Sequence, residues 1–192
     1  MRLQLCSILA LPLLLVFASE GDQIFMAEPI IQQSLQPTLA DLLTIESSAS
    51  IFYSYARELT SSKMFSDVES GPITLLVPTN KAVMALARKP HQGPATVDTG
   101  VIVTEQEYDA LSREHVERWV SAHIIPQSPI TFDQTYPTLL DGKSIEFTVS
   151  KKGDPNAPDW SRVVIDPNVR IVGKREASNG VLFLIDGTVL FD

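Results

Sequence analysis

The sequence has little cysteine, since Cys6 is the only one among 192 residues. A single thiol cannot form an intramolecular disulfide, and it cannot supply the paired C-x-x-C ligands of a structural zinc site. The stability of the fold must therefore come from a packed core, and a chain of this length is long enough to build one.

Clusters of basic residues are also scarce. The chain has 15 Lys and Arg against 23 Asp and Glu, which gives a formal net charge of −8. Its densest basic groups are only pairs, such as Arg88-Lys89 and Lys151-Lys152. Nucleic acids and anionic membrane surfaces require larger clusters of positive charge, so we expect neither as a partner.

Long hydrophobic runs are missing as well. The apolar stretch from Ile8 to Phe17 is shorter than the roughly 20 residues that a transmembrane helix needs. It follows Arg2 and ends in small residues, a pattern typical of a secretory signal peptide. We therefore expect residues 1–18 to be a cleaved signal, 19–36 a tether or short propeptide, and 37–192 a single domain. A membrane anchor at the N-terminus is the alternative.

The sequence lacks the common motifs of catalysis and metal binding. It contains no G-x-S-x-G and no H-E-x-x-H. His115 and His123 are eight residues apart, about 12 Å along a helix, which is too far for one metal ion. Gly142-Lys143-Ser144 imitates the end of a P-loop, but Pro137 stands where the first glycine is required. We therefore expect no metal, no cofactor and no enzymatic activity.

The most informative stretch that is present covers residues 73–83. Its first five residues are mostly apolar, which predicts a strand buried on both faces. Pro78 cannot donate a ladder hydrogen bond and ends this strand. Thr79 and Asn80 then offer side-chain oxygens to the start of a helix over 81–88.

Helical periodicity predicts four further helices. Thr38 is predicted to cap the first and Ser50 the second, and the other two start at Glu105 and at Arg113. Thr104 and Glu107 have the spacing of a capping box for the third of these. The last is predicted to continue to Ile125, with His123 on its apolar face. We expect His123 to be a buried imidazole bonded to a main-chain carbonyl.

After Pro129 the periodicity falls to two, the period of a β-strand. The predicted strands cover 144–149, 162–165, 169–172, 181–185 and 188–191. Asn179-Gly180 predicts a turn before the fourth of these strands, and Asp186-Gly187 predicts a two-residue hairpin before the fifth. Helices first and an antiparallel sheet later indicate an α+β domain.

Two features have no assigned role in this pattern. The loop over 89–104 contains two prolines and two glycines, and long loops of this kind are functional or mobile. Trp160 either presents an exposed aromatic contact or folds back to hold its own loop. An enzyme or small-ligand carrier, with a site assembled from loops around His91 and His123, is therefore the alternative to a non-enzymatic protein.

Three motifs resemble, in order and spacing, those of the fasciclin (FAS1) domain, and the likeness covers residues 37–192. They are T-L-L-V-P-T-N-K-A-V at 74–83, A-H-I-I at 122–125 and N-G-V-L-F-L-I-D at 179–186. The resemblance implies an α+β fold in which a wedge of β-strands is packed with several short helices.

The resemblance further implies adhesion or matrix interaction rather than catalysis, with a protein or a cell-wall or matrix polysaccharide as partner. The family's central motif is a Tyr-His pair that contacts integrins in some animal members, but Ala122 precedes His123 here, so only the histidine matches. The chain is most similar to small single-domain fasciclin proteins of fungi, which implies the vacuole lumen or, alternatively, secretion. The motif residues, which we expect to be mainly structural, are Pro78, Thr79, Asn80, His123, Asn179, Gly180 and Asp186.

Overall fold

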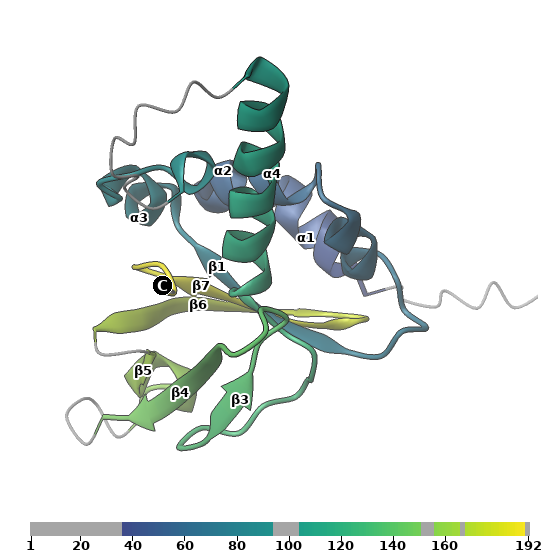
Figure 1. Cartoon of the computed structure of the whole chain (residues 1–192). Helices are drawn as coiled ribbons and strands as arrows, with labels where there is room; N and C mark the ends of the chain where they lie inside the picture. Colours follow the sequence, from purple (N-terminus) through teal and green to yellow (C-terminus); the bar gives the residue numbers. More distant parts are fainter. Residues whose placement is uncertain (1–35, 94–103, 151–155, 166–167, 191–192) are drawn as a thin grey trace, which may run out of the picture. The chain divides into compact units, whose positions relative to one another are not determined.

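The structure is a computed structural model that describes residues 36–93, 104–150, 156–165 and 168–190 (Figure 1). All of these residues belong to one compact unit that begins at Ser34. The expected signal peptide and all but the last residue of the expected tether lie outside the described residues. No helix within the described ranges is long and apolar enough to cross a membrane.

The helical part comes first along the chain, as the sequence predicted. Thr38 caps the first helix, and Asp41 completes a capping box by accepting hydrogen bonds from Thr38. The three leucines of this helix, Leu39, Leu42 and Leu43, are buried. The first four elements are α1 (Leu39–Ile45), η1 (Ser47–Ala49), α2 (Ser50–Ala56) and η2 (Thr60–Phe65).

Strand β1 (Ile73–Pro78) and helix α3 (Asn80–Ala85) follow, joined at Thr79, whose side chain accepts a hydrogen bond from the Ala82 amide. All six residues of β1 are buried, which confirms the predicted buried strand. The helix is shorter than the predicted 81–88. The Lys89 ammonium group donates hydrogen bonds to carbonyls of its last turn and of Leu86, and these bonds stabilise the early helix end.

One helix, α4 (Glu105–Ser121), replaces the two that were predicted over 105–125. Thr104 and Glu107 form the predicted capping box at its start. Nothing in the sequence around residue 113 breaks a helix, so the hydrogen-bond ladder continues through it. His123 lies beyond the helix end, directly before the short strand β2 (Ile124–Ile125). In the predicted 89–104 loop, Pro90–Gln92 form the 3-10 turn η3, and residues 94–103 lie outside the described ranges.

Within the described residues, the sheet has seven strands in the order β2-β1-β7-β6-β5-β4-β3. The α+β class is confirmed, but the sheet is mixed rather than wholly antiparallel, because β1 and β7 pair in parallel from Ile73 opposite Gly180 to Pro78 opposite Ile185. The remaining elements are β3 (Thr135–Pro137), β4 (Ser144–Val149), η4 (Asp159–Arg162), β5 (Val163–Ile165), β6 (Val169–Ala177) and β7 (Gly180–Ile185).

The predicted hairpin at Asp186-Gly187 and the strand after it are wrong. Residues 188–190 form no strand, and Phe191 lies outside the described residues. The reason is topological: β1 occupies one hydrogen-bonding edge of β7 and β6 occupies the other. Because β7 has no edge left for a further strand, the chain after Gly187 turns away from the sheet instead of pairing with it.

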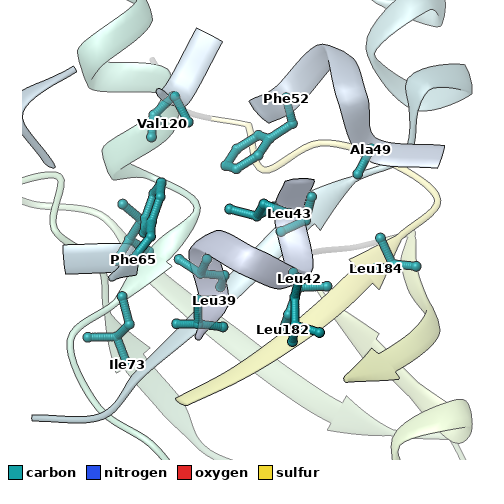
Figure 2. Packing of buried hydrophobic residues seen from close by; sticks show 14 of the residues in the cluster. Leu39, Leu42, Leu43, Ala49, Phe52, Phe65, Ile73, Val120, Leu182 and Leu184 are labelled. Carbon is teal, nitrogen blue, oxygen red and sulfur yellow. The ribbon is translucent and has the colours of Figure 1, made fainter. Parts of the chain in front are cut away.

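The central strands divide the core in two. Ile73, Leu75 and Val77 of β1 belong to one apolar cluster together with the helices, whereas Leu76 belongs to a second cluster with β4 and β5. Strand β7 alternates in the same way. Figure 1 shows helices α1 to α4 on one side of β1 and β7, with β3 to β5 on the other. Figure 2 shows side chains of this helical cluster, with Leu182 of β7 beside Leu42 of α1 and with Phe65 of η2 near Ile73 of β1.

Candidate functional site

His123 is the most deeply buried titratable residue of the three motifs. Its side chain is fully buried, at 0% exposure. Its Nδ1 lies 2.7 Å from the Trp119 carbonyl oxygen, and its Nε2 lies 3.1 Å from the Val189 amide nitrogen. A carbonyl only accepts and an amide only donates, so the ring carries its proton on Nδ1 and is neutral. The burial and the carbonyl partner that the sequence predicted are both present.

Aromatic rings surround this imidazole. The Trp119 ring centroid is 4.8 Å from that of His123, and the Phe52 centroid is 5.8 Å away. Burial among these rings lowers the pKa of His123 from 6.5 to about 4, against the opposing effect of the Trp119 carbonyl. With both nitrogens engaged and no solvent contact, this geometry offers no lone pair or proton for general acid-base chemistry.

Asn179, which precedes the last motif strand, connects three distant segments through its amide group. Its Oδ1 accepts a hydrogen bond from the Leu39 amide at the start of α1, at 2.9 Å. Its Nδ2 donates to main-chain carbonyls at and after the end of η2, the shortest bond being 2.9 Å to Phe65. The side chain is only 2% exposed. All of its polar atoms are therefore used to hold main-chain groups together.

Gly180 allows β7 to lie against β1. Its φ of +149° lies in the region that residues with a β-carbon rarely adopt. A β-carbon at this position would lie 1.9 Å from the Ile73 carbonyl oxygen. The turn predicted before this strand is present. Both the positive φ and the close approach of β1 require glycine at position 180.

Asp186 directly follows β7 and forms hydrogen bonds with Arg170 of β6. Its Oδ1 accepts a hydrogen bond from the Arg170 amide at 2.7 Å, and its own amide donates to the Arg170 carbonyl at 3.0 Å. The Arg170 Nε lies 3.5 Å from Oδ2. This carboxylate thus completes the ladder between β6 and β7, and all of these partners belong to one residue of the neighbouring strand.

Asn80 of the first motif connects helix α3 to helix α2. Its Oδ1 accepts a hydrogen bond from the Ile51 amide at 2.9 Å, while its Nδ2 donates to the Ser47 carbonyl and to the Ser50 hydroxyl. Ser50 was predicted to cap α2, but it is the first residue of that helix and makes no cap bond. The cap is supplied from 29 residues away, by Asn80.

The structure does not bring His91 and His123 together into one site. The rings of Tyr55 and Trp119 lie between them, with successive centroid distances of 6.1, 5.8 and 4.8 Å from His91 to His123. His91 Nδ1 bonds the Tyr55 hydroxyl at 3.0 Å, beside a cavity of about 270 Å³. Burial raises the pKa of Tyr55. In the part of the chain that the structure describes, no three His, Cys, Asp or Glu side chains are grouped to hold a metal ion.

Trp160 folds back against its own domain. It is half-buried and packs on the second apolar cluster. Together with Phe132 and Phe183 it lines a groove of about 300 Å³. Of the two roles left open by the sequence, the geometry favours holding the loop, although one side of the indole faces the groove. A lone tryptophan between polar residues gave no signal for its partners Phe132 and Phe183, which lie elsewhere in the sequence.

Comparison with known proteins agrees with this architecture. The sequence pattern of the fasciclin domain matches residues 47–191. A FAS1 domain-containing protein of Aspergillus fumigatus is 30% identical over 161 residues, which cover 81% of this chain and 64% of that protein. One of Emericella nidulans is 28% identical and one of Schizosaccharomyces pombe 26% identical, with 62% and 84% of those proteins covered. The chain thus spans a little under two thirds of the first two relatives.

A solved structure shows the same fold. The FAS1 domain pair of the insect cell adhesion molecule fasciclin I superposes with a TM-score of 0.56 at 15% identity, and the match covers 82% of this chain and 52% of that one. An identity of 15% supports a shared fold but no shared function. With the family pattern covering three quarters of the sequence and the fold agreeing, the chain belongs to the fasciclin domain family.

Proposed function

We propose that this protein is a non-catalytic interaction module of the secretory pathway and that it acts in adhesion. The observation that supports this proposal most is that the polar side chains of the motifs form their hydrogen bonds within the domain. The polar atoms of Asn80, His123, Asn179 and Asp186 bond main-chain groups or neighbouring side chains of the domain itself. What the three motifs have in common is therefore the building of a scaffold, which leaves binding to the outer surface.

The proposed partner is a component of a cell surface or matrix, either a protein or a cell-wall polysaccharide. The proposal of adhesion rests on the family and on the insect structure, which comes from a cell adhesion molecule. The relatives named above are fungal, so fungal cells are the natural test surface. The net charge of −8 argues against a nucleic acid or an anionic lipid as the partner.

Retention of cells on coated beads tests this function. Beads coated with the purified protein should retain washed fungal cells several-fold better than beads coated with albumin. Protease treatment of the cells separates the two partner classes, because it abolishes retention through a protein and preserves retention through a polysaccharide. Retention no higher than on albumin, together with turnover of an ester, peptide or glycoside substrate, would replace the proposal with the enzyme alternative.

We propose that the protein is located in the vacuole lumen, with the extracellular space as the alternative. This rests on the signal-like segment at residues 1–18 and on the similarity to fungal proteins. A fluorescent protein fused to the C-terminus should accumulate in the vacuole, and the purified protein should begin near Ser19 by mass spectrometry. A mass that retains residues 1–18 would contradict cleavage and would indicate a membrane anchor.

A further inference from the structure

A cavity of about 300 Å³ lies between the end of helix α3, turn η3, helix α4 and the segment 188–190. Its apolar wall includes Leu86, Pro90, Trp119, Val189 and Leu190. At roughly 30 Å³ for each water-sized group, it has room for about ten such groups. This volume is at the lower end of the range for small-molecule sites, and a mainly apolar wall is typical of them.

The charged groups of this cavity all have the same sign. Arg88, Lys89 and Arg118 line it, and no Asp or Glu is among its described lining residues. Arg88 and Lys89 direct their hydrogen bonds to neutral main-chain carbonyls: Arg88 to those of Gln92 and Gly93, and Lys89 to those near the end of α3. Those bonds fix the positions of both cations without cancelling their charge. A positive cavity in a chain of net charge −8 selects an anionic group.

His115 also lines the cavity. Its ring packs on Gly93, where an added β-carbon would lie 2.3 Å from Nδ1. This contact buries Nδ1, so the ring is part of the packed wall of the cavity.

From the apolar wall and the single sign of the lining charges we propose that the cavity binds a small amphipathic carboxylate, with its acid group toward Arg88 and Arg118 and its tail along Trp119 and Val189. The carboxylate supplies a negative charge that pairs with the guanidinium groups. The apolar wall excludes water from the tail. Such a site is separate from the adhesive surface proposed above and does not depend on it.

Isothermal titration calorimetry with octanoate and 1-octanol tests the proposal, because the two probes share their tail and differ in the acid group. Octanoate should bind at least tenfold more tightly than octanol. Trp119 lines the cavity and is one of only two tryptophans, so octanoate should also shift the emission of a Trp160→Phe protein. Equal binding of both probes would contradict the anionic part of the site. The absence of heat at millimolar octanoate would contradict the site as a whole.

A matched pair of variants at Leu190, which lines the cavity, tests whether octanoate binds there. Leu190 is 65% exposed, so replacing it should not disturb folding, which a melting curve verifies. Leu190→Glu should weaken octanoate binding at least fivefold, whereas Leu190→Lys should not weaken it. Arg118→Gln should weaken it similarly, and Arg57→Gln, an exposed arginine on another element, should change it less than twofold. The same affinity for the Glu and Lys variants would overturn the assignment of the probe to this cavity.

Discussion

At the scale of the residue, His123 is held in one protonation state by its neighbours. The Trp119 carbonyl requires a proton on Nδ1, and the Val189 amide requires a lone pair on Nε2. Protonation of Nε2 would break the second bond and place a charge among aromatic rings. The native structure therefore depends on a neutral imidazole, which ties its stability to pH.

This dependence has a definite direction. The unfolded chain binds a proton at His123 as the pH falls through about 6.5, whereas the folded chain resists it down to about 4. Stability from this residue is thus fully present above pH 6.5 and is lost between 6.5 and 4. Between pH 7 and pH 5 the free energy of unfolding should fall by about 2 kcal/mol from this residue alone.

Urea unfolding of the wild type and of His123→Gln at both pH values measures the effect. Other titrating groups contribute equally to the two proteins, so the difference between their pH dependences isolates His123. The wild type should lose about 2 kcal/mol more than the variant. The same pH dependence in both proteins would show that His123 is not buried in its neutral form.

Gly180 provides a second prediction for a single residue. Gly180→Ala should lower the free energy of unfolding by about 3 kcal/mol or more, because strain at positive φ adds to a collision with the Ile73 carbonyl. Gly142→Ala is the matched control. Its φ of +77° is also positive, but a β-carbon there meets no atom within 4 Å, so only the strain of about 1 kcal/mol remains. Equal losses in the two variants would rule out the collision.

At the scale of the element, long-range side-chain bonds fix how the short helices are placed. Helices of six or seven residues, such as α1, α2 and α3, are too short to be stable alone. Asn179 holds the start of α1 and the end of η2, and Asn80 holds the start of α2. These amides satisfy main-chain groups that the helix ends leave unpaired.

Removing the Asn179 side chain should therefore destabilise the whole domain. Asn179→Ala leaves the buried Leu39 amide without its acceptor and the η2 carbonyls without their donor, and we expect a loss of about 3 kcal/mol. Thermal unfolding monitored by circular dichroism measures it. Asn168→Ala, the same replacement at an exposed position, should cost less than about 0.5 kcal/mol. Similar melting temperatures for the two variants would contradict the role assigned to Asn179.

Local elements were predictable wherever local chemistry decides them. Capping at Thr38 and at Thr104 was correctly predicted, because a cap involves residues three apart in sequence. The hairpin at Asp186-Gly187 was not, because its formation depends on whether β7 has an open edge, and β1, about 100 residues earlier, occupies that edge. The Asn80 cap on α2 escaped prediction for the same reason.

At the scale of the whole molecule, the parallel pairing of β1 and β7 organises the fold. It places the first and last motifs side by side within the sheet and divides the core into two clusters. Sequence periodicity predicted both strands and the α+β class. It did not predict their mutual orientation, because apolar runs buried on both faces carry no information about partners. The cavity lined by His115 was missed likewise, since its walls come from three separate segments, 86–93, 115–119 and 188–190.

For the molecule as a whole, we propose that His123 supports the fold while binding occurs at the outer surface. Cell retention on beads coated with wild type or with His123→Gln, measured at pH 7 and divided by the folded fraction from a melting curve, tests this claim most directly. We predict equal retention per folded molecule for the two proteins, and well above albumin for both. A fully folded His123→Gln protein that no longer retains cells would place His123 in the binding site and contradict the claim.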